Sequence, residues 1–168
     1  PGQPKYCPKN YNGGFSGPVT FRHALANSLN IPAVKVLAVN NLESMIATAS
    51  AMGISTFNDP SRYGLSLTLG GGEVTMTDMA TAFGTLANGG VKVPLQGVLK
   101  ITDFKGKEYF EYKPEETLNK LNYFYNEANE NFNTVGYSHE GLTRVLNREP
   151  AFQISHILAD NNARASAF

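Results

Sequence analysis

The sequence predicts a helix-rich globular domain that contains one β-hairpin. Hydrophobic residues make up 42% of the 168 residues, which is typical of a chain that folds around a core and argues against disorder. Helical patterns run through most of the first 90 residues and are bounded by capping residues, prolines and glycines. Two segments with strand character on either side of a turn lie between residues 96 and 112.

The first helix is expected to follow an irregular N-terminal segment. Residues 1–18 are rich in Pro, Gly, Asn and Tyr and have no period, which predicts a loop. Thr20 is a suitable N-cap for a helix over about residues 21–28, because its hydroxyl can accept a hydrogen bond from a free backbone N–H of the first turn.

Two further helices are predicted directly after it. Pro32 suits the first turn of a helix that continues to about Val39, and the largely apolar sequence of this helix predicts that it is buried. The next helix spans about residues 42–52 and ends at Gly53, because glycine readily adopts the left-handed conformation that follows many helices.

The segment from Gly64 to Gly72 is expected to be a loop that closes on three consecutive glycines. We favour a packing role for these glycines over a phosphate-binding loop, because the Gly-Lys-Ser/Thr signature is absent. The clearest helix in the chain follows over residues 75–88, where Thr75 and Asp78 resemble a capping box. One face of this helix is apolar and is predicted to belong to the core: Met76, Met79, Ala80, Phe83, Leu86 and Ala87.

The second half of the chain contains the predicted hairpin. Residues 96–102 and 108–112 have strand character and are separated by a turn. Residues 113–145 are interpreted as a variable surface excursion with one helix near residues 115–128. Residues 141–147 are also predicted to be helical.

The last predicted helix covers residues 151–159, and Pro150 suits its start. No internal repeat is present, and the whole chain, residues 1–168, is interpreted as a single partial domain. It begins without a methionine and contains neither a signal peptide nor an apolar run of bilayer length, so we interpret it as an internal excerpt of a longer protein.

Composition excludes several classes of function. The 14 basic and 14 acidic side chains balance, so no nucleic-acid partner is predicted. Cys7 is the single cysteine, which rules out an intramolecular disulfide. The three histidines, His23, His139 and His156, lack the spacing of zinc ligands, and neither a metal nor a cofactor is predicted.

Ser28 and Asn30 are the candidate catalytic residues. A helical run of small residues stops at Ser28-Leu29-Asn30, and Pro32 then starts a new helix, so two polar side chains remain at a helix junction where they can face a cleft. A serine hydroxyl can donate and accept a proton, and an asparagine amide can hold a substrate amide in register. The alternative is that both residues only cap a helix end.

Five blocks of the sequence resemble the transpeptidase domain of class A penicillin-binding proteins. They are residues 6–11 (YCPKNY), 17–20 (GPVT), 24–35 (ALANSLNIPAVK), 67–75 (LTLGGGEVT) and 79–90 (MATAFGTLANGG). Their order and spacing also match the family. The resemblance is strong over residues 6–103, weak over residues 113–145 and moderate over residues 145–168.

The resemblance implies an enzyme that cross-links peptidoglycan. In this family the serine of a Ser-x-x-Lys motif attacks the D-Ala-D-Ala carbonyl of a stem peptide, and an amine of a neighbouring stem peptide then takes the acyl group. By this resemblance Ser28 relays a proton to the departing D-Ala amine, and Asn30 holds the substrate amide. Leu29 replaces the Asp of the Ser-Asp-Asn motif, which argues against a class A β-lactamase. β-Lactams are the implied covalent inhibitors.

The other two motifs of the family do not occur in the sequence. No serine is followed by a lysine three positions later, and Lys105-Gly106-Lys107 only resembles a fragment of Lys-Thr-Gly. The resemblance therefore assigns the nucleophile to the parent protein and predicts that the excerpt is inactive by itself. It implies a parent at the outer face of the bacterial cytoplasmic membrane, with a membrane anchor and a glycosyltransferase domain.

The fold implied by the resemblance is α/β, with a central antiparallel sheet flanked by helices. The excerpt would supply mainly the helical part and one hairpin of this penicillin-binding-protein/β-lactamase-like fold. Other functions stay open at this point: a D,D-carboxypeptidase in which water replaces the acceptor amine, a penicillin-binding sensor without turnover, and an interaction module in which Ser28-Leu29-Asn30 is only a cap.

Overall fold

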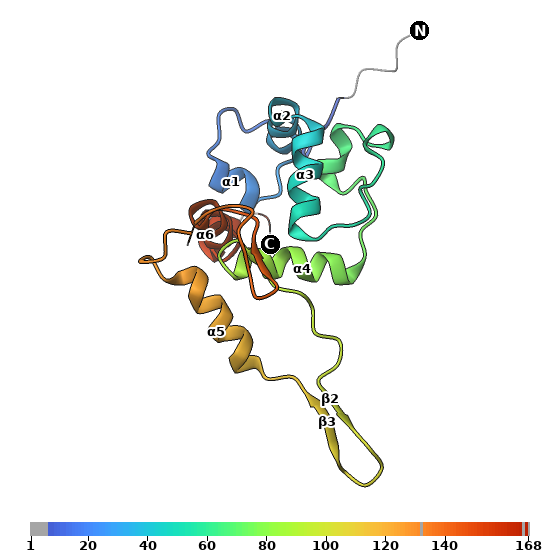
Figure 1. Ribbon diagram of the computed structural model, residues 1–168. Coiled ribbons are helices and arrows are strands. Elements are labelled where there is room, and N and C mark those ends of the chain that lie inside the picture. Colours follow the sequence, from blue (N-terminus) through green and yellow to red (C-terminus); the bar gives the residue numbers. More distant parts are fainter. Residues whose placement is uncertain (1–6, 132, 166, 168) are drawn as a thin grey trace. The chain divides into compact units, whose positions relative to one another are not determined.

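The computed structural model describes residues 7–131, 133–165 and 167 (Figure 1). Tyr6, the first residue of the first matched block, and Phe168 lie outside the described residues, as do the first six residues of the predicted N-terminal loop. None of the helices in the described ranges is both long enough and apolar enough to cross a membrane.

The chain divides into two compact units. One comprises residues 1–50, 55–74 and 153–168, and we call it the motif unit because it contains Ser28-Leu29-Asn30. The other comprises residues 51–54 and 75–152, and we call it the hairpin unit. The interpretation of the chain as a single partial domain stays a prediction.

The motif unit is built from helices and two short 3-10 turns. Its elements are α1 (Phe21–Ala26), α2 (Asn30–Asn40), most of α3 (Leu42–Met52), η1 (Pro60–Arg62), η2 (Leu65–Leu69), the second half of α6 (Arg148–Leu158) and α7 (Asn161–Arg164). The turn η2 packs along α2, and α1 packs against α7 and α2. The buried apolar side chains are Ala24, Ala26, Val34, Leu37, Ile46 and Leu67.

The predicted helices of this unit are present. The Thr20 hydroxyl accepts a hydrogen bond from the backbone N–H of His23 at 3.2 Å, as expected of an N-cap. Helix α2 begins two residues before Pro32, so the proline occupies the first turn, where its missing N–H has no intrahelical partner to lose. The prediction that α2 is buried holds for Val34 and Leu37 but is wrong for Val36 and Val39, which are exposed.

The three consecutive glycines have the packing role that the sequence predicts. Gly70 adopts φ +90° and ends η2 in the left-handed conformation. A Cβ on Gly72 would lie 2.5 Å from Leu67 Cδ1 and 2.7 Å from Phe57 Cε1, which is closer than atoms can pack. Gly72 therefore lets the chain pass directly against these two side chains.

The hairpin unit combines helices with two small antiparallel sheets. Its elements are α4 (Met76–Ala87), β1 (Val91–Lys92), β2 (Lys100–Thr102), β3 (Glu108–Glu111), α5 (Pro114–Tyr125), β4 (Ser138–His139), β5 (Leu142–Arg144) and the first half of α6. One sheet has the order β1-β5-β4, and the other is the β2–β3 hairpin. The core contains Val91, Leu121, Phe124 and Leu142. Three of these four residues come from the segment 113–145, whose variability stays a prediction.

The prediction of a helix over residues 141–147 is wrong. Leu142 to Arg144 form β5, in which Leu142 and Arg144 are buried and Thr143 lies opposite Ser138. Glu140 and Gly141 both have positive φ and make the turn that joins β4 to β5. A run this short fits a helical or a strand period equally well, so pairing with neighbouring strands determines which structure it adopts.

The apolar face predicted for the helix over residues 75–88 is not part of the core of the hairpin unit. Met76 is 90% exposed, and Met79 and Phe83 are also exposed. The buried residues of α4 are Ala82 and Thr85. Thr81 of the same helix packs closely on Gly53: a Cβ on Gly53 would lie 2.8 Å from Thr81 Cγ2.

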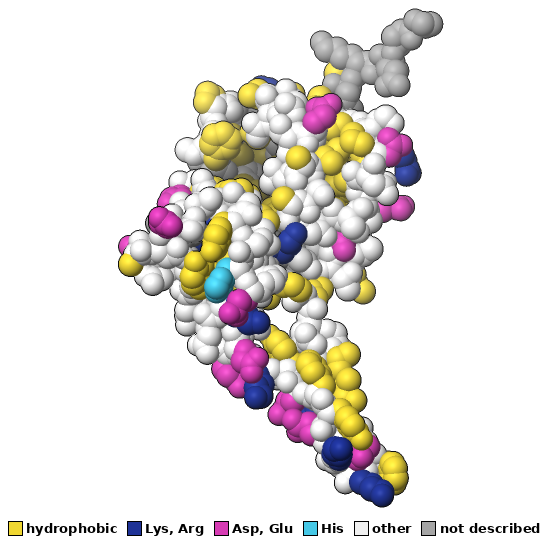
Figure 2. Space-filling model, viewed as in Figure 1, with side chains coloured by type: hydrophobic (Ala, Val, Ile, Leu, Met, Phe, Trp, Pro, Cys, Tyr) yellow, Lys and Arg dark blue, Asp and Glu magenta, His cyan; other side chains and the backbone are white. Residues whose placement is uncertain are grey.

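The predicted hairpin is present as the two-stranded β2–β3 ribbon, although its strands are shorter than expected. Lys100 lies opposite Glu111, and Lys100 Nζ lies 3.0 Å from Glu111 Oε1. All seven strand residues are exposed. Figure 2 shows apolar side chains along this ribbon next to lysine and glutamate side chains.

Candidate functional site

The backbone at the end of α1 places Ser28 in an unusual conformation. The N–H of Ser28 donates to the carbonyl of Leu25 at 3.2 Å, and the N–H of Leu29 donates to the carbonyl of Ala24 at 2.9 Å. These two bonds are the pattern of a Schellman motif, in which the residue after the helix end adopts the left-handed conformation. Ser28 occupies that position, with φ +52°.

Glycine is the residue usually found at this position of a Schellman motif. A side chain with a Cβ is strained there by about 1 kcal/mol, because the Cβ approaches the following carbonyl oxygen. The sequence therefore places a hydroxyl group at a point where glycine would be more stable. This strain is the observation that separates Ser28 from an ordinary capping residue.

Asn30 is the first residue of α2, and its side chain is held by the N-terminal loop. Its Nδ2 donates a hydrogen bond to the backbone carbonyl of Lys9 at 2.9 Å. This bond uses one of the two N–H groups of the amide. The next residue, Ile31, donates its backbone N–H to Oδ1 of Asn10 at 3.2 Å.

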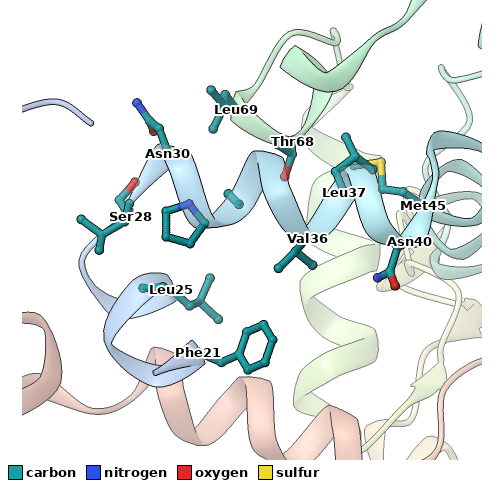
Figure 3. A pocket seen from close by; sticks show the side chains of 14 residues that line it. Phe21, Leu25, Ser28, Asn30, Val36, Leu37, Asn40, Met45, Thr68 and Leu69 are labelled. Carbon is teal, nitrogen blue, oxygen red and sulfur yellow. The ribbon is translucent and has the colours of Figure 1, made fainter. Parts of the chain in front are cut away.

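Ser28 and Asn30 both line a pocket of about 460 Å³ in the motif unit. The other lining residues come from α1, the junction at Leu29, α2, the beginning of α3 and η2, and all of the lining residues are uncharged. In Figure 3 the two polar side chains lie at one end of the pocket, and the side chains of Phe21, Leu25 and Val36 form an apolar wall along it. The pocket can take an apolar group beside two hydrogen-bonding side chains.

A second set of polar contacts ties the two ends of α1 to α7 and its N-cap residue Asp160. The Asn27 amide donates to the backbone carbonyl of Ala163 at 2.8 Å, and Arg22 Nη1 lies 2.9 Å from Asp160 Oδ2. The backbone N–H of Ala163 and the Arg22 guanidinium hold the pKa of Asp160 below its usual value. The residue directly before Ser28 is thus fixed by contacts to a helix more than 130 positions later in the chain.

The sequence predicts Ser28 and Asn30 as catalytic residues, and the structure places both on one pocket. It missed Asn10 and Asn27, which hold the two sides of the corner between α1 and α2. Asn10 lies within the first matched block and Asn27 within the third, but nothing in their spacing shows which backbone groups they bind. In the described part of the chain no group of three or more His, Cys, Asp or Glu residues could hold a metal ion.

No family model matches the chain. Penicillin-binding protein 1A of Rickettsia felis is 30% identical over 168 residues, which is all of this chain and 20% of that protein. Penicillin-binding protein 4 of Bacillus subtilis is 33% identical over 114 residues, 67% of this chain and 18% of that protein. The crystal structure of penicillin-binding protein 1A from Haemophilus influenzae superposes on 97% of this chain with a TM-score of 0.68 and 27% identity.

The chain belongs to the penicillin-binding protein family. Its fold is part of the penicillin-binding-protein/β-lactamase-like fold, which confirms the predicted fold class. The chain spans about a fifth of the length of the relatives from Rickettsia and Bacillus.

Proposed function

We propose that this chain is the central part of a peptidoglycan D,D-transpeptidase and that Ser28 and Asn30 belong to its active site. The single observation that carries the proposal is the left-handed backbone of Ser28 at the rim of the pocket. Strained residues persist where the hydroxyl or another side-chain group has a use that glycine cannot supply. The names of the related proteins support the penicillin-binding part of the proposal.

The proposed reaction divides the chemistry between this chain and the rest of its parent protein. A serine of a Ser-x-x-Lys motif, which these 168 residues do not contain, attacks the D-Ala-D-Ala carbonyl of a stem peptide. The peptide bond breaks, the D-Ala amine leaves with a proton relayed by the Ser28 hydroxyl, and an acyl-enzyme remains. An amine of a second stem peptide then forms the new amide bond.

The chain's own side chains suit these roles. The Ser28 hydroxyl can pass a proton because it both donates and accepts, but it needs a base from another part of the protein, since the pocket lining is uncharged. The Nδ2 of Asn30 is bound to the Lys9 carbonyl, so the amide oxygen of Asn30 is the group that can accept a hydrogen bond from a substrate amide N–H. β-Lactams would acylate the same nucleophile.

The proposal also covers the setting of the parent protein. The substrates are extracytoplasmic, so we place the parent at the outer face of the bacterial cytoplasmic membrane, held by an anchor outside these residues. No cofactor, metal or nucleic acid takes part in the proposed reaction. The glycosyltransferase domain expected from the resemblance likewise belongs to the parent.

The test is the Ser28→Gly substitution in the full-length parent protein. Glycine fits φ +52° without strain, so we expect the thermal midpoint to stay the same or to rise. Acylation by a fluorescent penicillin and cross-linking of stem peptides should both slow by about 100-fold or more, because a proton relay contributes about that much. The acylation rate is measured from labelled protein on denaturing gels.

Glu140→Gly is the matched control. Glu140 is also a non-glycine residue with positive φ, lies in the turn between β4 and β5, and does not line the pocket. It should relieve similar strain and leave acylation unchanged. An unchanged acylation rate in Ser28→Gly would sink the proposed role. Acylation of the unaltered parent without any cross-linked product would favour the carboxypeptidase or the sensor.

A further inference from the structure

Helix α2, which carries Asn30, cannot cap its own N-terminus. Its N-cap residue is Leu29, whose side chain has no hydrogen-bonding group. The first N–H groups of a helix have no intrahelical partner and need an acceptor. Here the acceptor for the Ile31 N–H is Oδ1 of Asn10, a residue 21 positions earlier in the chain.

Asn10 is itself fixed in place. It is one of the few buried polar residues among those described. Its Nδ2 donates to the carbonyl of Gly14 at 2.9 Å, and its own carbonyl accepts the N–H of Gly13 at 2.9 Å. The Asn10 side chain therefore links a tight turn of the N-terminal loop to the first turn of α2.

Lys9, the residue before Asn10 in the loop, binds the Asn30 side chain at the start of α2. The carbonyl of Lys9 accepts the Asn30 amide, while Asn10 accepts the Ile31 backbone. Two consecutive residues of one loop thus fix both the start of α2 and the direction of the Asn30 side chain. In Figure 3 the amide nitrogen of Asn30 points away from the pocket.

We propose that Asn10 is a positioning residue for the active site, which it serves by fixing the first turn of α2 and, with Lys9, the orientation of Asn30. This inference rests on the proposed function of Ser28 and Asn30. Asn10 does not line the Ser28 pocket, so its effect on the reaction is transmitted through α2. Small displacements of a group that orients substrate slow a reaction strongly, which gives the inference a measurable consequence.

The experiment compares Asn10→Ala, Asn10→Asp and Thr75→Ala in the full-length parent. Asn10→Ala removes both the acceptor for the Ile31 N–H and the donor to the Gly14 carbonyl. Asn10→Asp keeps an acceptor that a helix N-terminus favours, but it loses the donor to Gly14. Thr75→Ala removes the equivalent bond from α4, where the Thr75 hydroxyl accepts the Asp78 N–H at 3.1 Å. It therefore reports the effect of losing a cap elsewhere in the chain.

The readout is the acylation rate constant at saturating fluorescent penicillin, measured well below the thermal midpoint of each variant. We expect Asn10→Ala to slow acylation by about 10- to 100-fold. Asn10→Asp should acylate faster than Asn10→Ala but more slowly than the unaltered protein, because it restores only one of the two side-chain bonds, and Thr75→Ala should leave the rate unchanged. If Asn10→Ala does not fold, Asn10→Ser replaces it, and its shorter acceptor should give an intermediate rate.

The inference is overturned if Asn10→Ala acylates like the unaltered protein, if it loses no more than Thr75→Ala, or if Asn10→Asp is no faster than Asn10→Ala. Ser28→Gly is assayed beside these variants. Loss in Ser28→Gly with full activity in Asn10→Ala would reject the positioning role alone. Full activity in Ser28→Gly would reject the proposed function itself.

Discussion

The two units each use one buried polar side chain to hold helix ends, but the two side chains differ in charge. In the motif unit, neutral Asn10 accepts a hydrogen bond at the N-terminus of α2. In the hairpin unit, the fully buried Arg144 donates to carbonyl groups at 2.8 Å, 3.2 Å and 3.0 Å, which belong to Gly89, Leu146 and Phe124. One residue supplies an acceptor where N–H groups are free, and the other supplies donors where carbonyls are free.

The charge of Arg144 suits its position. Phe124 lies in the last turn of α5 and Gly89 follows the end of α4, so the guanidinium contacts the negative ends of two helix dipoles. The guanidinium also lies 5.8 Å from the centre of the Phe124 ring. Burial lowers the pKa of Arg144, although the group stays charged at neutral pH.

The two units therefore depend on their buried polar residues to different degrees. Removing the Asn10 side chain leaves the Ile31 N–H without its acceptor and the Gly14 carbonyl without its donor. Removing the Arg144 side chain leaves three carbonyls without donors and a cavity among α4, α5 and β5. The larger loss of stability is therefore expected in the hairpin unit and the larger loss of activity in the motif unit.

The largest expected effect on stability is that of Arg144→Met. We expect a loss of about 3 kcal/mol or more in the stability of the hairpin unit, because hydrogen bonds from a charged group are lost and buried carbonyls remain unpaired. Hydrogen exchange of backbone amides of residues 75–152 in the parent protein measures this loss. Arg144→Lys keeps the charge but not the planar group of donors, so the stability of this variant should lie between that of Arg144→Met and that of the unaltered protein.

Arg148→Met is the control for this change. Arg148 is exposed and pairs with Glu127 at 3.1 Å, and an exposed pair of this kind contributes about 1 kcal/mol or less. If Arg144→Met and Arg148→Met had equal effects, the contrast between the buried charge and a surface charge would be wrong. If Asn10→Ala destabilised the chain as much as Arg144→Met, the contrast between the two units would fail.

The second expected effect is a loss of stability in α1, whose N-cap is the adjacent residue Thr20. Thr20→Ala removes the bond to the His23 N–H, and we expect it to destabilise α1 by about 1 kcal/mol. Thr20→Ser keeps the hydroxyl and should restore most of this stability. Thermal unfolding of the parent, with exchange of the His23 amide, measures both. Equal stability of the alanine and serine variants would show that the local cap contributes nothing.

Local caps also explain which parts of the fold the sequence could predict. Thr20, Thr75 and Gly53 bound helices through bonds and backbone angles within a few residues, and the predicted helices at these points are present. The bond from Asn10 to Ile31 joins segments 21 positions apart, and no local pattern reveals it. The catalytic roles of Ser28 and Asn30 stay a prediction, which rests on the matched blocks that surround the pair.

Features that depend on partners were the ones the sequence could not predict. Residues 142–144 became a strand because β1 and β4 pair with them on both sides. The apolar face of α4 was predicted to be buried, but a helix pattern shows only that a face is apolar and not what covers it. The strain at Ser28 depends on the Schellman motif, and a serine after a helix does not by itself indicate positive φ.

The smallest expected effect is the pH dependence of the contacts between α1 and α7. Asp160 accepts the Ala163 N–H at 2.9 Å and pairs with Arg22, and these contacts lower its pKa below the usual value of 3.8. Because the folded protein holds the ionised form, the stabilising contribution is present above pH 3.8 and is lost as the pH falls through the lowered pKa. Acidification should therefore loosen α7 from α1.

The amide resonance of Ala163, followed between pH 7 and pH 3, measures this change in parent protein labelled with ¹⁵N-alanine. It should shift in the unaltered protein with a midpoint below 3.8. In Asp160→Asn it should stay constant, because asparagine can still cap α7 through its side-chain oxygen but cannot titrate. A midpoint at or above 3.8, or the same shift in both proteins, would show that the Asp160 carboxylate does not hold these two helix ends together. The Asn27 amide, through its neutral bond to Ala163, would then be the polar contact that holds the end of α1 to α7 at every pH of the titration.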